Sequence, residues 1–184
     1  MTVDRLPNPA VLVGHSLGGF AIQRYLEDHR APAGVLVGSP PPSGGMRLTC
    51  RMARHDPLGT LKLFMTLRAK PMFASPDDAR YWYFSAEAPA KEVAEYAARL
   101  QDESFRATAN TLIRPVRTKR VTTPLLVCGG SKDRTATPSD VALTALRYGV
   151  EPVILDGLPH DLMLDAGWAR AASYIADWLG ARLL

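Results

Sequence analysis

Three side chains in this sequence are of the types that together turn a serine hydroxyl into a nucleophile. Ser16 stands at the centre of the pattern G-H-S-L-G over residues 14–18, which matches G-x-S-x-G. A serine hydroxyl is a weak nucleophile at neutral pH and needs a general base, which an acid must orient. Asp133 and His160 follow later in the chain, in that order. These residues predict chemistry that passes through a covalent serine intermediate.

The residues that flank Ser16 predict a sharp turn between a buried strand and a helix. The apolar run Ala10 to Val13 comes before the turn, and apolar residues recur at helical spacing from Phe20 to about Arg30. A nucleophile at such a turn sits in strained backbone geometry, which points its hydroxyl away from the sheet. The context therefore supports the pattern as a nucleophile elbow.

Each neighbour of Ser16 has an expected place in this elbow. Side chains two residues to either side would collide with the turn, so Gly14 and Gly18 are expected for steric reasons. The backbone N–H of Leu17 lies at the positive end of the helix, where it would donate to a developing oxyanion. His15 is expected to pack or hydrogen-bond locally inside the turn.

The proposed acid and base each follow an apolar strand. The run Pro124 to Gly129 leads into the loop that carries Asp133, and the run Val150 to Leu155 leads into the loop that carries His160. In open parallel sheets, catalytic groups gather beyond the carboxyl ends of the strands. Among the competitors, Asp140 is expected at a helix start and Asp165 at a helix cap or solvated turn. The competing residues are Asp140, Asp156, Asp161, Asp165, His15, His29 and His55.

The order of the elements predicts an α/β fold with about four parallel strands flanked by helices. Gly34 to Gly38 supplies the remaining strand, and near-continuous apolar strands separated by helices are typical of a parallel sheet covered on both faces. Helices are expected over Ser139 to Tyr148 and Trp168 to Leu183. We expect the core to comprise residues 1–43 and 119–184, with residues 44–118 as a helical cap insertion.

The expected cap has a composition of its own. It contains 12 Lys and Arg against 8 Asp and Glu, whereas the other 109 residues balance at 10 against 10. Its aromatic and methionine side chains would either line an apolar pocket or pack the cap on the core. Helices are expected over Pro57 to Arg68, Pro76 to Phe84 and Pro89 to Gln101. The apolar residues in question are Met46, Met52, Met65, Met72, Phe73, Tyr81, Trp82, Tyr83 and Phe84.

Composition excludes several classes of protein. The chain has 184 residues, 47% hydrophobic and 22% charged, which suits one soluble folded domain. Its net charge of +4 is scattered and forms no stripe for nucleic acid. No apolar run is long enough for a transmembrane helix, and the start lacks signal-peptide features. Cys50 and Cys128 have no metal-binding or disulfide spacing, so we expect a reduced, cytoplasmic protein.

Three segments together resemble the carboxyl-terminal part of an α/β-hydrolase of the cap-bearing esterase and lysophospholipase-like branch. They are VLVGHSLGG at 11–19, LLVCGGSKDRTATP at 125–138 and LPHDLMLD at 158–165. The resemblance implies Ser16 as nucleophile, His160 as general base and then acid, and Asp133 as the residue that orients His160. It also implies a small hydrophobic ester as substrate, with no metal and no organic cofactor.

The sequence departs from this family at its beginning. The family's nucleophile follows the fifth strand, whereas Ser16 follows the first, so the loop that supplies a second oxyanion donor has no counterpart here. Losing one such donor typically costs about 10² to 10³ in rate. An unpaired edge at residues 10–13 would invite self-association. We expect a start site assigned too late, because Val3 to Pro9 looks like the end of a helix and its loop; a self-pairing fragment and a decayed gene product are the alternatives.

Two other functions stay open at this stage. One is a different serine reaction of the same fold, such as thioester hydrolysis, carbon–carbon hydrolysis or acyl transfer. The other is a non-catalytic fragment that folds only with a partner or as a dimer.

Overall fold

Four parallel strands form the centre of the molecule in a computed structural model, which describes residues 6–73, 75–102 and 104–183. The strands lie in the order β1-β2-β3-β4, each hydrogen-bonded in parallel to the next. The predicted α/β architecture with four parallel strands is confirmed. The strands are β1 (Leu12–His15), β2 (Gly34–Val37), β3 (Leu125–Gly130) and β4 (Pro152–Leu155).

The two central strands are buried along their whole length, as their unbroken apolar runs predict. β1 forms one edge of the described sheet, and Val13 on it is 58% exposed. This strand begins and ends two residues later than predicted, so it runs directly into the elbow at Ser16. The apolar run marked the strand, but the turn geometry decides where it ends.

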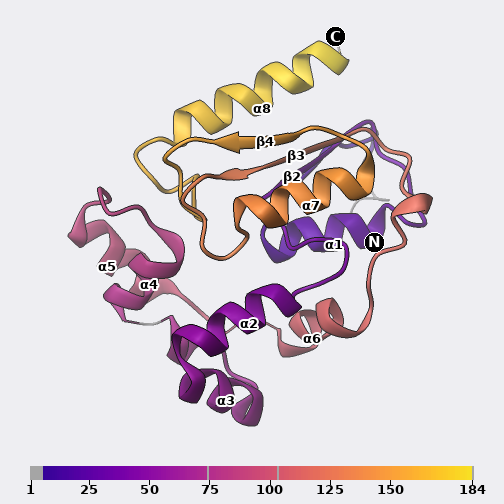
Figure 1. Cartoon of the computed structure of the whole chain (residues 1–184). Coiled ribbons are helices and arrows are strands. Elements are labelled where there is room, and N and C mark those ends of the chain that lie inside the picture. Colours follow the sequence, from indigo (N-terminus) through magenta and orange to yellow (C-terminus); the bar gives the residue numbers. More distant parts are fainter. Residues whose placement is uncertain (1–5, 74, 103, 184) are drawn as a thin grey trace.

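Helices cover both faces of the sheet (Figure 1). On one face, α1 (Leu17–Tyr25) and α7 (Pro138–Tyr148) lie against alternate strand residues, with Leu36 and Val127 in a shared core. On the other face, α8 (Trp168–Leu183) packs over the remaining alternate residues, including Val37 and Cys128. Alternation along each strand therefore divides the apolar residues between two cores.

A helical insertion, residues 44–118, lies between β2 and β3 and leaves the sheet at its carboxyl edge. Its described regular structure is entirely helical. Two of its helices, α2 and α6, were not individually predicted from the sequence. The helices are α2 (Met46–His55), α3 (Pro57–Thr66), α4 (Pro76–Tyr83), α5 (Ala90–Arg99) and α6 (Phe105–Ile113), with short 3₁₀ turns η2 (Lys70–Met72) and η3 (Thr118–Arg120).

The aromatic and methionine residues of this insertion differ in their surroundings. Met52, Phe73, Trp82 and Tyr83 line a cavity and also pack with Met72 in one core of the insertion, whereas Phe84 is buried in a second core. Met46 and Met65 are exposed, which neither sequence-based expectation anticipated. Tyr81 stacks against His55 and under the guanidinium of Arg134.

None of the helices in the described residues is both long and apolar enough to cross a membrane. The sequence-based expectation of a helix end over Val3 to Pro9 falls partly on residues 1–5, outside the described residues. Residues 6–9 are not helical.

Candidate active site

Ser16 occupies a strained turn between β1 and α1. Its backbone has φ 50° and ψ −124°, in the left-handed half of conformational space that non-glycine residues rarely adopt. The Ser16 N–H donates to the carbonyl of Val37 on the neighbouring strand, at 2.9 Å. Helix α1 begins at the next residue, Leu17. The turn has the geometry that the elbow pattern predicts.

The two glycines of the elbow have different reasons for lacking a side chain. A Cβ on Gly14 would lie 2.6 Å from Ile22 Cδ1 and 2.7 Å from the backbone of Gly18. A Cβ on Gly18 would meet nothing within 4 Å beyond its own helix turn. The expectation that neighbours sterically demand a glycine at position 18 is therefore wrong. Gly18 instead lines the main cavity, where a side chain would project into open space.

Asp133 and His160 form a buried pair beyond the carboxyl ends of β3 and β4. His160 Nδ1 donates to Asp133 Oδ2 at 2.8 Å, and the two residues are 2% and 3% exposed. The second carboxylate oxygen accepts the N–H groups of Thr135 and Ala136, both at 2.7 Å. Backbone donors and the imidazole thus compensate the desolvated carboxylate and fix the orientation of the ring.

Gly38 makes room for this pair at the end of β2. Its φ is +51°, and a Cβ there would lie 3.2 Å from Asp133 Oδ2 and 3.3 Å from His160 Nδ1. Both the backbone conformation and the close approach favour glycine. Sequence analysis placed Gly38 at a strand end but did not connect it with the site, because only the fold brings it beside Asp133.

Ser16 and His160 both line one cavity of about 320 Å³ between the sheet edge and the helical insertion. Leu17 lines it too, and as the first residue of α1 its N–H has no acceptor within the helix. The cavity wall from the insertion is largely apolar. The insertion residues are Leu48, Met52, Leu63, Ala69, Lys70, Phe73, Trp82, Tyr83, Leu100, Gln101 and Thr108.

The last turn of α4 holds the two loops that carry Asp133 and His160. Its carbonyls have no partners within the helix, as at any helix end. The carbonyl of Tyr81 accepts from the Arg134 guanidinium at 3.0 Å, and that of Trp82 accepts from the Thr135 hydroxyl at 3.2 Å. One residue further on, the Tyr83 carbonyl accepts the N–H of Asp161 at 2.9 Å. The insertion is therefore bonded to both loops.

Arg51 on α2 holds the Asp133 loop from a second direction. Its guanidinium donates to the carbonyls of Arg134 and Thr135, at 3.2 and 2.6 Å, and to Asp140 Oδ2 at 2.7 Å. Asp140 is almost fully buried, closes the capping box at the start of α7 and also accepts from Arg47. The pattern of the sequence gave no signal for Arg51, whose partners lie more than 80 residues away.

His15 reaches the loop of the proposed base. Its Nε2–H donates to the backbone carbonyl of His160 at 3.0 Å, and the two rings lie 4.5 Å apart. Burial, and next the neighbouring His160, lower the pKa of His15 from 6.5 to about 4. Asp161 lies 3.7 Å from His15 Nε2, and burial raises the pKa of its carboxyl. His15 thus bonds across the fold and not only locally.

Three of these groups are the types of residue that bind metals. Ligand atoms of His15, His160 and Asp161 lie within 4.8 Å of one another. However, His160 Nδ1 is bonded to Asp133, and His15 Nε2 is bonded to a carbonyl. A metal on His15 Nε2 would displace the bond to that carbonyl, whereas the bond from His160 Nδ1 to Asp133 is compatible with a metal on Nε2.

The competing acids and histidines have other partners. Asp165 is buried and accepts the N–H of Ser85 at 3.1 Å, so the expectation of a solvated turn there is wrong. Asp140 lies at a helix start, as expected. The remaining contacts are Asp156 with Ser131, His29 with Tyr25, and His55 with Tyr81.

A parallel sheet with a serine elbow at its carboxyl edge, and a histidine–aspartate pair whose histidine lines the same cavity, defines an α/β protein of the hydrolase class. The model of the alpha/beta hydrolase family matches residues 2–173. This chain belongs to the alpha/beta hydrolase family. None of the curated protein sequences matches it.

Solved structures agree on the fold. The chain is similar to an esterase from Thermogutta terrifontis (18% identity, TM-score 0.57) over 94% of this chain and 65% of that one. It is also similar to a monoacylglycerol lipase from Paleococcus ferrophilus (19%, 0.57) over 98% and 72%. A carboxylesterase structure from Nitrososphaera gargenis (15%, 0.64) is matched over 95% and 65%. For a protein from Acinetobacter baumannii, this chain spans 61% of the length.

The elbow glycines give a matched pair of substitutions. We expect Gly14→Ala to lower the free energy of unfolding by about 1 to 3 kcal/mol, because its Cβ would overlap backbone. We expect Gly18→Ala to leave that free energy unchanged or slightly higher, because alanine favours a helix and space is open. Urea unfolding of both variants measures the difference. Equal losses would show that the elbow is not packed as described.

Arg51→Gln tests whether Arg51 stabilises the loop that carries Asp133. We expect a loss of about 1 to 3 kcal/mol in the free energy of unfolding, because two carbonyls and a buried carboxylate lose a charged donor. Arg54→Gln, on an exposed position of the same helix, is the control and should change it by less than about 0.5 kcal/mol. Thermal or urea unfolding reports both. Similar losses of unfolding free energy in the two variants would contradict a stabilising role of Arg51.

The pKa of His15 predicts an acid-sensitive stability. Between pH 6.5 and about 4 the unfolded chain binds a proton at His15 that the folded chain does not, so stability should fall as pH falls through this window. His15→Gln keeps an N–H donor for His160 but cannot titrate there. We expect its stability to decline less steeply than that of the wild type over the same window, measured by urea unfolding at several pH values. Parallel pH profiles would refute the assignment.

Proposed function

We propose that the protein hydrolyses carboxylic esters of hydrophobic acyl compounds through an acyl-Ser16 intermediate. The observation that carries the proposal is the buried Asp133–His160 pair, whose histidine lines one cavity together with Ser16. The alpha/beta hydrolase family and the esterase and lipase names of similar structures support hydrolysis in general. Ester specificity is our inference from the apolar cavity.

The proposed reaction follows from the order of the groups. His160 Nε2 takes the proton of the Ser16 hydroxyl as the oxygen attacks the ester carbonyl, and Asp133 stabilises the imidazolium that forms. The Leu17 N–H donates to the oxyanion of the tetrahedral intermediate. His160 then gives its proton to the leaving alkoxide. Water, activated by the same imidazole, releases the acid and restores Ser16.

The helical insertion would act as the cap over this reaction. Its wall of leucine, methionine and aromatic side chains faces Ser16 across the cavity, which suits an acyl chain better than a charged group. The bonds from α4 and Arg51 to the loops of Asp133 and His160 support a cap that also helps to order the site. The cytoplasmic location stays a prediction, consistent with unpaired Cys50 and Cys128.

A partner-dependent protein is the second candidate, and the edge strand favours it. β1 has Val13 58% exposed at the edge of the described sheet. An apolar edge of this kind pairs readily with another strand. Self-association through residues 10–13 therefore stays a proposal beside the enzymatic one.

A fluorophosphonate probe tests the enzymatic proposal. We expect covalent labelling at Ser16, located by mass spectrometry of the labelled peptide, because the probe traps a serine whose proton a neighbouring base accepts. Ser16→Ala should abolish labelling. Asp133→Asn should slow it by about 10² to 10⁴, since the imidazole loses its orienting acceptor.

The control for this experiment is a serine outside the site. Ser131→Ala removes a hydroxyl that bonds Asp156 near the same sheet edge and should leave the labelling rate unchanged. A folded wild-type chain that labels no faster than Ser16→Ala would overturn the enzymatic proposal for this chain.

A further inference from the structure

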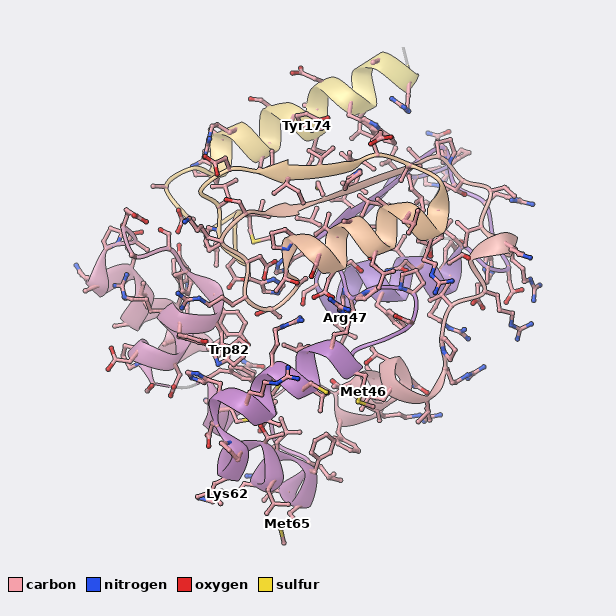
Figure 2. All side chains as sticks on the ribbon, viewed as in Figure 1. Met46, Arg47, Lys62, Met65, Trp82 and Tyr174 are labelled. Carbon is pink, nitrogen blue, oxygen red and sulfur yellow. The ribbon has the colours of Figure 1, made fainter. Side chains whose placement is uncertain are left out.

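The outer face of α3 carries large apolar side chains in solvent. Leu58, Leu61 and Met65 are 70%, 55% and 76% exposed, and their spacing places them on one stripe of the helix together with Lys62. We name these four residues the α3 face. Figure 2 shows Lys62 and Met65 at the end of the molecule farthest from α8, pointing away from the body.

This pattern is the reverse of an ordinary surface helix. A helix on a protein core buries its apolar stripe and exposes its polar residues. In α3 the one buried residue is Thr60, while the stripe of leucine and methionine faces outward. Contiguous exposed apolar side chains of this size mark an interaction surface.

The charge around the α3 face is net positive. Residues 46–72 contain one acidic residue, Asp56, whose side chain caps the start of α3, and six Lys and Arg, of which Arg47 and Arg51 pair with Asp140. Lys62 lies within the stripe, and Arg54 and Arg68 lie exposed close to the two ends of the helix. Apolar side chains mixed with cations are the composition of helices that lie in the interface of an anionic membrane.

The same face is continuous with the candidate active site. Phe64, next to Met65, is 42% exposed and also lines a second cavity, of about 110 Å³. Leu63 lines both this cavity and the main one, and Ser16 lines both as well. The exposed face is therefore next to a cavity that the candidate nucleophile also lines.

We propose that the α3 face docks on the surface of a membrane that contains anionic phospholipids. Leu58, Leu61 and Met65 enter the boundary between head groups and acyl chains, while Lys62 and its neighbours contact lipid phosphates. The further step, in which docking delivers a membrane-dissolved ester to Ser16, rests on the proposed function. The docking itself does not.

A second copy of the chain is the less suitable occupant. In a symmetric dimer the same patch meets itself, so the cations of the two α3 segments would face each other. Like charges brought together in this way disfavour association. An anionic lipid surface satisfies the charge and the apolar side chains at once.

Sedimentation with lipid vesicles tests the docking. We expect the full chain to bind vesicles of equimolar phosphatidylcholine and phosphatidylglycerol, and to bind pure phosphatidylcholine at least about tenfold more weakly. The triple variant Leu58→Ser, Leu61→Ser and Met65→Ser should lose about tenfold or more in partition coefficient. Lys62→Gln should lose about fivefold.

The matched control is Leu146→Ser, which removes a leucine 75% exposed on α7, and it should bind like the wild type. Equal binding by the triple variant, or no binding of the wild type to anionic vesicles, would overturn the proposal. The proposal would also be overturned if the chain formed a concentration-dependent dimer that Lys62→Gln strengthens and the triple variant abolishes. That result would assign the α3 face to a second copy of the chain.

Hydrolysis of water-soluble p-nitrophenyl acetate separates this proposal from the enzymatic one. All α3-face variants should keep the wild-type rate on it, because none of their residues lines either cavity. Vesicle binding without any hydrolysis would leave docking standing and the enzymatic proposal refuted. Hydrolysis without α3-dependent binding would leave the enzymatic proposal standing and refute the docking.

Discussion

The need to compensate one buried carboxylate dictates much of the structure around the candidate site. Asp133 lies at the end of a strand that is buried on both faces, where an unpaired charge would be very costly. Three donors surround it: two consecutive backbone N–H groups of its own loop, and His160. The loop must therefore curl back on the carboxylate, and the next strand must end where its histidine reaches the same point. Gly38 leaves the space in which they meet.

The helical insertion contributes bonds to the site as well as a wall. Carbonyls at the end of a helix need donors, and those at the end of α4 find them in the loops of Asp133 and His160. Arg51 adds a charged contact from α2 to the same loop. Movement of the insertion away from the sheet would break these bonds, so access to the cavity and order in the Asp133–His160 pair are physically coupled. An insertion bonded in this way would suit the proposed role of a cap, since such a site must both exclude water and keep its geometry.

Sequence was most informative where local requirements decide the structure. The strands, the elbow around Ser16 and the places of Asp133 and His160 after their strands all follow from short-range pattern and from the common edge of parallel strands. The steric argument failed at Gly18, because the direction of a Cβ depends on the helix that follows. Arg51 and Gly38 gave no signal, since their contacts join segments far apart in the chain. The exposure of Met46 and Met65 could not be predicted either. Composition shows that a segment is apolar, but the elements packed against the segment decide which of its residues are buried.

The electrostatics around His160 show why the residue before the nucleophile matters. During the proposed reaction His160 becomes an imidazolium, whose charge Asp133 balances. A second positive charge at His15, whose ring lies 4.5 Å away, would oppose that step. Burial holds the pKa of His15 at about 4, so near neutral pH the ring is neutral and donates a hydrogen bond to the His160 carbonyl without adding charge. A lysine or arginine at this position could supply the donor but would keep its charge. A neutral imidazole therefore meets both requirements: it tethers the base and leaves the local charge to the reacting pair.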